Sequence, residues 1–244
     1  RDDFGPFTPG FVVVPYGDAQ AIEDAITPNT AAVMVEPIQG EAGVVVPPPG
    51  YLRILRRICD QHNVLLIADE IQTGLGRTGR LFASDYEGIR PDMVIIGKAL
   101  AGGFYPVSAV LADPDIMGLF TPGEHGSTFG GNPLGMAVAR AALRVIVEEK
   151  LVENSARLGE YFMEQLCEIP SPHVKEIRGK GLLIGVELKP EAGGARRFCE
   201  QLAERGILAK ETHQHVIRFA PPLVITKEVL DWALPHIREV LNIR

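Results

Sequence analysis

Two short apolar runs, VLLIADE at residues 64–70 and MVIIGK at residues 93–98, decide the fold. Both are continuous aliphatic stretches of strand length, and each ends in charged residues. Continuous apolar runs that alternate with helical segments are typical of a mainly parallel sheet covered on both faces. The sequence therefore predicts two strands of such a sheet, with Asp69, Glu70 and Lys98 at their carboxyl ends.

The pattern continues on both sides of these runs. Other short apolar stretches predict further strands, and apolar side chains at helical spacing predict the helices that cover the sheet. The further elements are strands at residues 31–37 and 107–111, helices at 51–62 and 132–149, and an irregular arm at 1–18.

The texture of the sequence changes near residue 150. Beyond it, short helical and strand-like segments alternate, which predicts an α+β unit rather than more of the parallel sheet. These segments are helices at residues 152–167, 195–205 and 227–241 and strands at 181–188, 207–210 and 216–219. We predict the carboxyl-terminal part of a large α/β domain over residues 1–150 and a small C-terminal domain over residues 151–244.

The composition is that of a folded, acidic protein. The 244 residues are 46% hydrophobic, and 24 Lys and Arg against 31 Asp and Glu give a net charge of −7. This composition excludes a disordered chain, and without a basic stripe we expect no nucleic-acid partner. No apolar run is long enough for a bilayer, so no membrane association is expected, and three scattered cysteines indicate a reducing compartment. We expect a cytoplasmic protein, or a mitochondrial-matrix one in a eukaryote, and a chain that begins inside a longer protein because it lacks an initiator Met.

Two nucleotide-binding motifs are incomplete in this sequence. A P-loop around Lys98 lacks its first glycine and its Ser or Thr. Residues 74–79 match G-x-G-x-x-G, yet five residues (69–73) separate them from the strand and no convincing helix follows. A Gly-rich connection is the better interpretation. For Asp69 and Glu70, the plain alternative is a helix cap or an ion pair with a nearby Arg.

Asp69 and Lys98 together indicate one cofactor. They lie 98 − 69 = 29 residues apart, which leaves room for one crossover, and ligands of open α/β sheets bind at the carboxyl ends of the strands. A lysine that emerges from a sheet interior is expected to be partly buried and nucleophilic toward carbonyl groups. An aspartate that holds a pyridinium proton and a lysine that forms a Schiff base are what pyridoxal 5′-phosphate (PLP) requires. The alternative is a lysine that merely extends into solvent from a strand end.

Six long stretches resemble the class-III, fold-type-I PLP-dependent aminotransferases and run through essentially the whole chain. They are VEPIQGEAGVVVPPPGYL (35–52), LLIADEIQTGLGRTG (65–79), IIGKALAGGFYPVSAVLAD (95–113), GEHGSTFGGNPLG (123–135), RGKGLLIGVEL (178–188) and VIRFAPPLVIT (216–226). The resemblance implies the α/β fold of type I, a PLP-dependent transferase fold. It also implies an incomplete large domain, because chains of this family are much longer at the N-terminus, and the missing N-terminal portion of the same enzyme would be a partner of this chain.

The resemblance implies roles for five residues around the cofactor. Lys98 would bind PLP covalently and then shuttle a proton, and Asp69 would pair with the pyridine nitrogen. Gln72 would hydrogen-bond the ring hydroxyl. Ser127 and Thr128 would reach the phosphate bound in a neighbouring subunit, which implies a homo-oligomer, at least a dimer, with shared sites.

The resemblance also implies amino-acid and oxo-acid substrates. Several stretches are most similar to the members that transfer the δ-amino group of ornithine to 2-oxoglutarate, giving glutamate semialdehyde and glutamate. Arg218 would bind the α-carboxylate of glutamate or 2-oxoglutarate through a bidentate pair, and Glu41 would cover Arg218 while ornithine is bound. The alternatives are an aminotransferase for acetylornithine or another ω-amino acid, and a non-catalytic fragment that retains a dimerisation surface.

Three other polar residues receive plainer interpretations. His213 and His215 have the spacing of metal ligands in a strand, but no third ligand type clusters near them in sequence, so no metal site is expected. Glu36 comes at a predicted strand end, where a structural ion pair is the expected role. Its closeness in sequence to Glu41 makes the two easy to confuse as the residue that covers Arg218.

Overall fold

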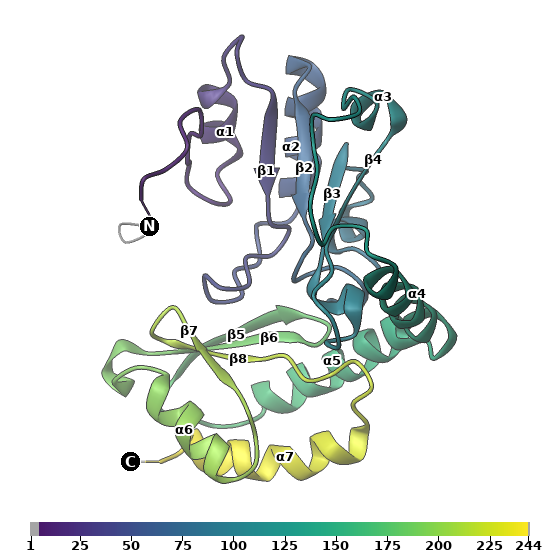
Figure 1. The fold of residues 1–244 in the computed structure, drawn as a ribbon. Helices are drawn as coiled ribbons and strands as arrows, with labels where there is room; N and C mark the ends of the chain where they lie inside the picture. The colour runs from purple at the N-terminus through teal and green to yellow at the C-terminus, as the bar shows by residue number, and fades with distance from the viewer. Residues whose placement is uncertain (1–4, 244) are drawn as a thin grey trace.

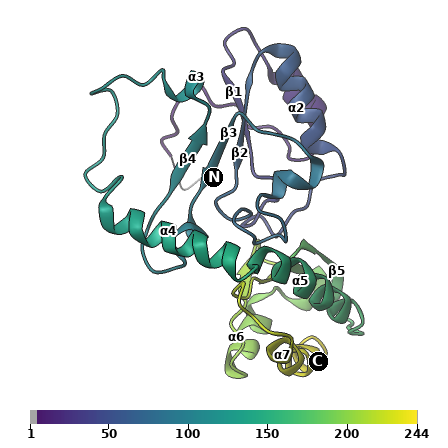
Figure 2. The same ribbon diagram turned by 90° about the vertical axis from the view of Figure 1, so that its right-hand side faces the viewer.

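The computed structural model describes residues 5–243, which form two four-stranded sheets, one above the other in Figure 1. Two helices, α4 (Pro133–Glu148) and α5 (Leu151–Cys167), follow each other along the junction between the sheets (Figure 2). Glu149 and Lys150 separate these helices, and Lys150 has a left-handed backbone with φ of 52°. The first sheet lies before this point in sequence and the second after it, while the domain boundary at residue 150 itself stays a prediction.

The first sheet is mainly parallel, as predicted. It consists of β1 (Ala32–Val35), β2 (Leu65–Asp69), β3 (Met93–Ile96) and β4 (Ala109–Ala112), in that order. The first three strands are parallel and β4 is antiparallel to β3. Val35 pairs with Ala68, and Asp69 pairs with Ile95, so the carboxyl ends of the three parallel strands meet at one edge.

Helix α2 (Tyr51–His62) has the predicted bounds and covers one face of this sheet. Its buried residues, among them Leu52, Leu55 and Cys59, form a core cluster with strand residues of β1 and β2. The prediction of a sheet covered on both faces is wrong for the described residues. Met34 is 55% exposed and Val110 is 45% exposed, because no described helix packs over their part of the sheet.

The second sheet is antiparallel throughout and carries the larger core. Its strands are β5 (Val174–Lys180), β6 (Leu183–Leu188), β7 (Lys210–Thr212) and β8 (Val216–Phe219), in the order β5-β6-β8-β7. Helices α5, α6 (Arg196–Glu204) and α7 (Lys227–Val240) pack with them around fully buried residues such as Leu158, Ile184 and Ile217. The α+β prediction for this part of the chain is confirmed.

Some elements differ from the predictions for identifiable reasons. The strand predicted at residues 207–210 is wrong, since β7 begins only at Lys210 and residues 207–209 lie outside the ladder. Strand β5 was not predicted because its sequence, VKEIRGK, is polar and mostly unburied. The remaining short elements are α1 (Ala19–Ala25), η2 (Ala83–Glu87), η3 (Lys98–Ala101), α3 (Pro114–Met117) and η4 (Pro190–Ala192). Within residues 5–243, no helix combines the length and the apolar character needed to cross a membrane.

The Gly-rich loop at residues 74–79 joins the two sheets. The Arg77 side chain donates from Nη1 to the carbonyl oxygens of Leu182 (3.1 Å) and Pro221 (2.5 Å). Its own carbonyl oxygen accepts from the Leu182 N–H and the Ser155 hydroxyl. Burial lowers the pKa of Arg77 to about 10, with the positive charge of Arg218 adding to the effect. Through these hydrogen bonds of Arg77 the loop fixes how the two sheets are placed against each other.

Candidate active site

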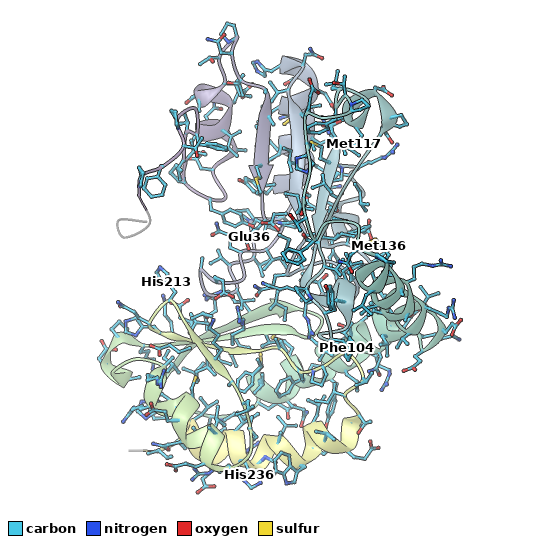
Figure 3. The ribbon with its side chains drawn as sticks, in the orientation of Figure 1. Glu36, Phe104, Met117, Met136, His213 and His236 are labelled. Atoms are coloured by element: carbon cyan, nitrogen blue, oxygen red, sulfur yellow. The ribbon has the colours of Figure 1, made fainter. Side chains whose placement is uncertain are left out.

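Polar residues follow each of the three parallel strands of the first sheet. Glu36 follows β1, Asp69 ends β2, and Lys98 comes two residues after β3. Figure 3 shows Glu36 at the end of the first sheet that faces the second sheet. Strands β1, β2 and β3 pair side by side, so these three residues follow neighbouring strands, and the charges of Asp69, Lys98 and Glu41 all affect the pKa of Glu36. This edge is where open α/β sheets bind their ligands.

Lys98 begins the short helix η3 in a left-handed conformation with φ of 43°. The Leu100 N–H closes the turn onto the Gly97 carbonyl oxygen. The side chain of Lys98 is exposed, so the prediction of a partly buried lysine is wrong. The residue leaves the strand at a sharp turn instead of continuing it, and a Cβ added to nearby Gly103 would meet no atom within 4 Å.

The neighbouring carboxylates Asp69 and Glu70 have different roles. Asp69 is half-buried, and its Oδ1 accepts only the Ile71 N–H (3.0 Å) among the described hydrogen bonds. Glu70 is 1% exposed and accepts from the backbone N–H groups of Ala83 and Ser84 and from the Ser84 and Thr73 hydroxyls. Glu70 therefore caps the N-terminus of η2. Its role is structural, and Asp69 is the carboxylate that is available at the candidate site.

Four side chains surround one carboxylate, that of Glu41, and we call them the carboxylate cluster: Glu41 and Gln72, from the loops after β1 and β2, and Lys210 and Arg218, from β7 and β8. The Arg218 Nη1 group lies 2.7 Å from Glu41 Oε1 and 2.9 Å from Gln72 Oε1. Gln72 Nε2 donates to Glu41 Oε1 (3.2 Å), and Lys210 Nζ lies 3.4 Å from Glu41 Oε2. A Cβ on Gly40 would lie 2.2 Å from Gln72 Oε1, so only glycine at position 40 lets this amide approach.

The ion pair with Arg218 dominates the electrostatics of Glu41. The hydrogen bond from Arg218 lowers the pKa of Glu41 to about 2, and Gln72 and the charge of Lys210 contribute in the same direction. The Glu41 side chain is 59% exposed, and the lowered pKa keeps it ionised well below neutral pH. The Arg218 side chain is only 13% exposed, so the cluster holds a largely buried cation under a more exposed anion.

The loop that carries Glu41 is anchored to the second sheet. Arg178, on β5, donates from Nε to the Val44 carbonyl oxygen (3.0 Å) and from Nη2 to that of Gly43 (2.7 Å). Gly43 has φ of 110°, which favours glycine, and Val44 is fully buried against Leu183. The backbone around Glu41 is thus fixed, while its side chain stays at the surface.

Ser127 and Thr128 lie in a different environment, an exposed loop. They belong to the exposed connection at residues 118–132, between α3 and α4. The Ser127 hydroxyl accepts only the Gly130 N–H, 2.9 Å away, among the described hydrogen bonds. Nothing in the described part of the chain brings them to the carboxylate cluster, and their contact with a cofactor phosphate stays a prediction.

Two other predictions end differently. No ion pair of Glu36 is found among the described residues, so the ion-pair prediction is wrong: its Oε2 accepts the Gly40 N–H (3.1 Å), and burial raises its pKa. His213 has φ of 48° and lies in the exposed turn between β7 and β8 (Figure 3). Among residues 5–243, no three His, Cys, Asp or Glu side chains are grouped so that they could hold a metal ion.

Sequence reasoning missed two parts of this site. Lys210 was not selected because the predicted strand ended at the residue where β7 begins, and the polar residues from Lys210 to Thr212 show no apolar alternation that would mark a strand. Tyr16 was missed as well. Its hydroxyl lies 3.0 Å from the carbonyl oxygens of Glu36 and Pro37, a contact between residues 20 and 21 positions apart for which the sequence carries no signal.

The structure is thus an α/β fold with a lysine and an aspartate at the ends of adjacent parallel strands, an arrangement that indicates a PLP-dependent enzyme. The family model for class-III aminotransferases matches residues 1–241, and the chain belongs to that family. It is 60% identical over 243 residues to the ornithine aminotransferase of Brevibacillus brevis, covering 100% of this chain and 60% of that protein.

Solved structures agree with this assignment. The ornithine aminotransferase of Toxoplasma gondii, in which PLP partly occupies the active site, is similar with a TM-score of 0.95 and 50% identity, over 98% of this chain and 57% of that one. The acetylornithine aminotransferase of Elizabethkingia anophelis is similar with a TM-score of 0.91 and 49% identity, over 96% of this chain and 63% of that one. The chain thus spans about three fifths of the length of these relatives.

The residues at this edge fit PLP, the cofactor of this family. Lys98 supplies an exposed amine, and Asp69 supplies a carboxylate with free hydrogen-bonding capacity on the neighbouring strand. Gln72 lies within the carboxylate cluster, in contact with Glu41 and Arg218, and its bond to the ring hydroxyl stays a prediction. An amine, a carboxylate and a carboxylate-binding arginine are the donor set that amino-acid chemistry on PLP needs.

Proposed function

We propose that this chain, together with a further N-terminal segment, transfers the δ-amino group of ornithine to 2-oxoglutarate, giving glutamate semialdehyde and glutamate. We call the two together the complete enzyme; the segment is part of the same polypeptide or a second chain. The observation that carries the proposal is the 2.7 Å ion pair between Glu41 and Arg218, in a chain whose Asp69 and Lys98 come at the ends of neighbouring parallel strands. The relatives named ornithine aminotransferase support it.

The chemistry of the site divides among few residues. When bound, PLP supplies an electron sink that stabilises negative charge on the substrate carbon beside the amine. Lys98 holds the cofactor and moves a proton to and from that carbon. Asp69 keeps a proton on the ring nitrogen, because a carboxylate beside a pyridinium favours its charged form. Gln72 would orient the ring through its hydroxyl.

The carboxylate cluster determines which amino group reacts. Ornithine has an amine at each end, and a free Arg218 would bind its α-carboxylate and present the α-amine to the cofactor. Glu41 occupies Arg218 and removes that pose, so the δ-amine enters. Glutamate and 2-oxoglutarate displace Glu41 from Arg218 with their own carboxylate. A charge-assisted hydrogen bond contributes about 1.5–3 kcal/mol, which corresponds to about tenfold to 100-fold discrimination.

Two further points complete the proposal. The complete enzyme is a homo-oligomer, at least a dimer, in which Ser127 and Thr128 bind the phosphate of the neighbouring subunit's cofactor. It acts in the cytoplasm, or in the mitochondrial matrix of a eukaryote.

The second candidate function, transamination of acetylornithine or another ω-amino acid, is supported by the similarity to a solved acetylornithine aminotransferase.

The test is a product assay of the complete enzyme with ornithine, 2-oxoglutarate and PLP. We expect equal amounts of glutamate and of the pyrroline that forms when glutamate semialdehyde cyclises. Turnover of acetylornithine but not of ornithine would support the second candidate. No turnover of either, with an unchanged PLP spectrum, would indicate a non-catalytic chain.

A further inference from the structure

We propose that Lys210 is a second cation of the ornithine-selective site, which holds Glu41 when Arg218 turns to a substrate carboxylate. The inference rests on the proposed function and adds a positioning residue to it. Lys210 and Arg218 are direct cross-strand partners on β7 and β8, so their side chains stand on the same face of the second sheet. Glu41, from the loop between β1 and α2, contacts both.

The two cations hold different oxygens of Glu41. Oε1 receives Arg218 Nη1 at 2.7 Å and Gln72 Nε2 at 3.2 Å. Among the described residues, Oε2 has only Lys210 Nζ as a partner, at 3.4 Å. Because no donor is shared between the two oxygens, Arg218 can release Oε1 without disturbing the contact at Oε2. The Glu41 carboxylate therefore has a cationic partner both when it pairs with Arg218 and when Arg218 binds a substrate carboxylate.

The difference in burial gives the two cations different roles. The Arg218 side chain is 13% exposed and fixed beside Gln72, whereas that of Lys210 is 63% exposed. A lysine has a long flexible stem and a single charged group that can follow a moving carboxylate. Arg218 is thus the fixed receptor for the substrate, and Lys210 is the mobile partner of Glu41.

The surroundings of Glu41 favour such a partner. Two cations directly opposite each other on neighbouring strands repel, and Glu41 between them offsets that repulsion. Glu36 and Asp69 are further carboxyl groups, at the ends of β1 and β2, and Glu41 already contributes to the raised pKa of Glu36. A Glu41 displaced from Arg218 without Lys210 would be an unpaired anion beside like charges. Its displacement would then be harder, which penalises glutamate and 2-oxoglutarate rather than ornithine.

The matched variants are Lys210→Gln and Lys175→Gln in the complete enzyme. Lys175 is an exposed lysine of the same sheet, on β5, whose ammonium group pairs with Glu187 (2.6 Å) and which is not among the contacts of Glu41. The ornithine and glutamate half-reactions are measured separately by stopped-flow spectroscopy of the cofactor. For Lys210→Gln we expect the ratio of the glutamate KM to the ornithine KM to rise about twofold to fivefold, as for loss of an exposed ion pair. Lys210→Arg should restore the ratio, and Lys175→Gln should leave it unchanged.

A double variant separates positioning from general charge effects. In a Glu41→Gln background, Lys210→Gln should no longer change the ratio, because the carboxylate it holds is gone. The inference is overturned if Lys210→Gln leaves the ratio unchanged, slows both half-reactions equally, or acts as strongly without Glu41. A wild-type enzyme that reacts with glutamate but not ornithine would refute the proposed substrate, and the Lys210 variants would then be compared by the glutamate KM alone, which should still rise about twofold to fivefold in Lys210→Gln. A wild-type enzyme with no glutamate reaction would overturn both.

Discussion

The carboxylate cluster and the loop at residues 118–132 are built in opposite ways. In the cluster, Glu41 and Arg218 come from different sheets and lie 177 positions apart in sequence. In the loop, the side-chain hydrogen bonds of Ser127 and Glu124 span three positions, and Phe129 is 76% exposed. Long-range contacts within this chain hold the first region together. The side-chain hydrogen bonds of the second region are local, and its contact with another subunit is a prediction that comes from the family resemblance.

The largest effect should come from removing Lys98 in the complete enzyme. Without its amine the proton has no carrier at the substrate carbon, and positioned acid–base groups contribute about 10²–10⁴-fold to rate. Lys98→Ala should therefore lower turnover by about that factor. Borohydride treatment of the wild type with PLP should attach the cofactor covalently, and peptide mapping should place it on Lys98. A label on Lys180 or Lys210 would refute the assignment.

A pair of adjacent variants, Asp69→Ala and Glu70→Ala, should separate activity from stability. Asp69→Ala should weaken PLP binding and nearly abolish turnover, because the ring nitrogen loses its carboxylate partner. The free energy of unfolding should change little, because Asp69 accepts one backbone hydrogen bond among the described contacts. Glu70 satisfies four buried donors, so Glu70→Ala should cost at least about 1–3 kcal/mol of unfolding free energy. Urea unfolding and turnover are measured for both. Near-normal turnover of Asp69→Ala would make Asp69 a structural cap.

Much of this architecture could be predicted from sequence, and the failures have physical causes. Helix α2 and strands β3 and β8 have the predicted bounds, because apolar side chains at helical spacing mark the helix and short apolar runs mark the strands. Strand β5 and helix α1 are short or polar, and tertiary contacts stabilise them. For the site, strand-end positions suggested Asp69 and Lys98, whereas the pairing of Glu41 with Arg218 came only from family resemblance. Lys210 depends on the register of β7 against β8, which no local pattern specifies.

A smaller effect is expected in the 118–132 loop. If Thr128 binds the phosphate of a neighbouring subunit's cofactor, Thr128→Val should raise the PLP dissociation constant about fivefold to tenfold, the loss of roughly one hydrogen bond. Spectroscopic titration with PLP measures it, and analytical ultracentrifugation shows the oligomeric state. An enzyme that stays fully active as a monomer at high dilution would contradict the assignment and with it the contrast between the two regions.

The smallest effect is a pH dependence of stability at Glu41. Its pKa is lowered from 4.5 to about 2 by Arg218, so the ion pair contributes fully above about pH 4.5 and is lost as the pH falls toward 2. Glu41→Gln should lower Tm by a similar amount at pH 7 and pH 5, and by clearly less at pH 3. Thermal unfolding at the three pH values measures it. A difference at pH 3 as large as that at pH 7 would mean that Glu41 does not titrate as a partner of Arg218.

The central claim is that Glu41 keeps Arg218 from capturing the wrong end of ornithine. Single-turnover product analysis of Glu41→Ala with ornithine, in the complete enzyme loaded with PLP, tests it most directly. The account predicts a mixture of the δ-semialdehyde, seen as its pyrroline, and the product of α-amino transfer, together with a faster glutamate half-reaction than in the wild type. If the variant gives only the δ-product and no faster glutamate reaction, Glu41 does not select the reacting amine.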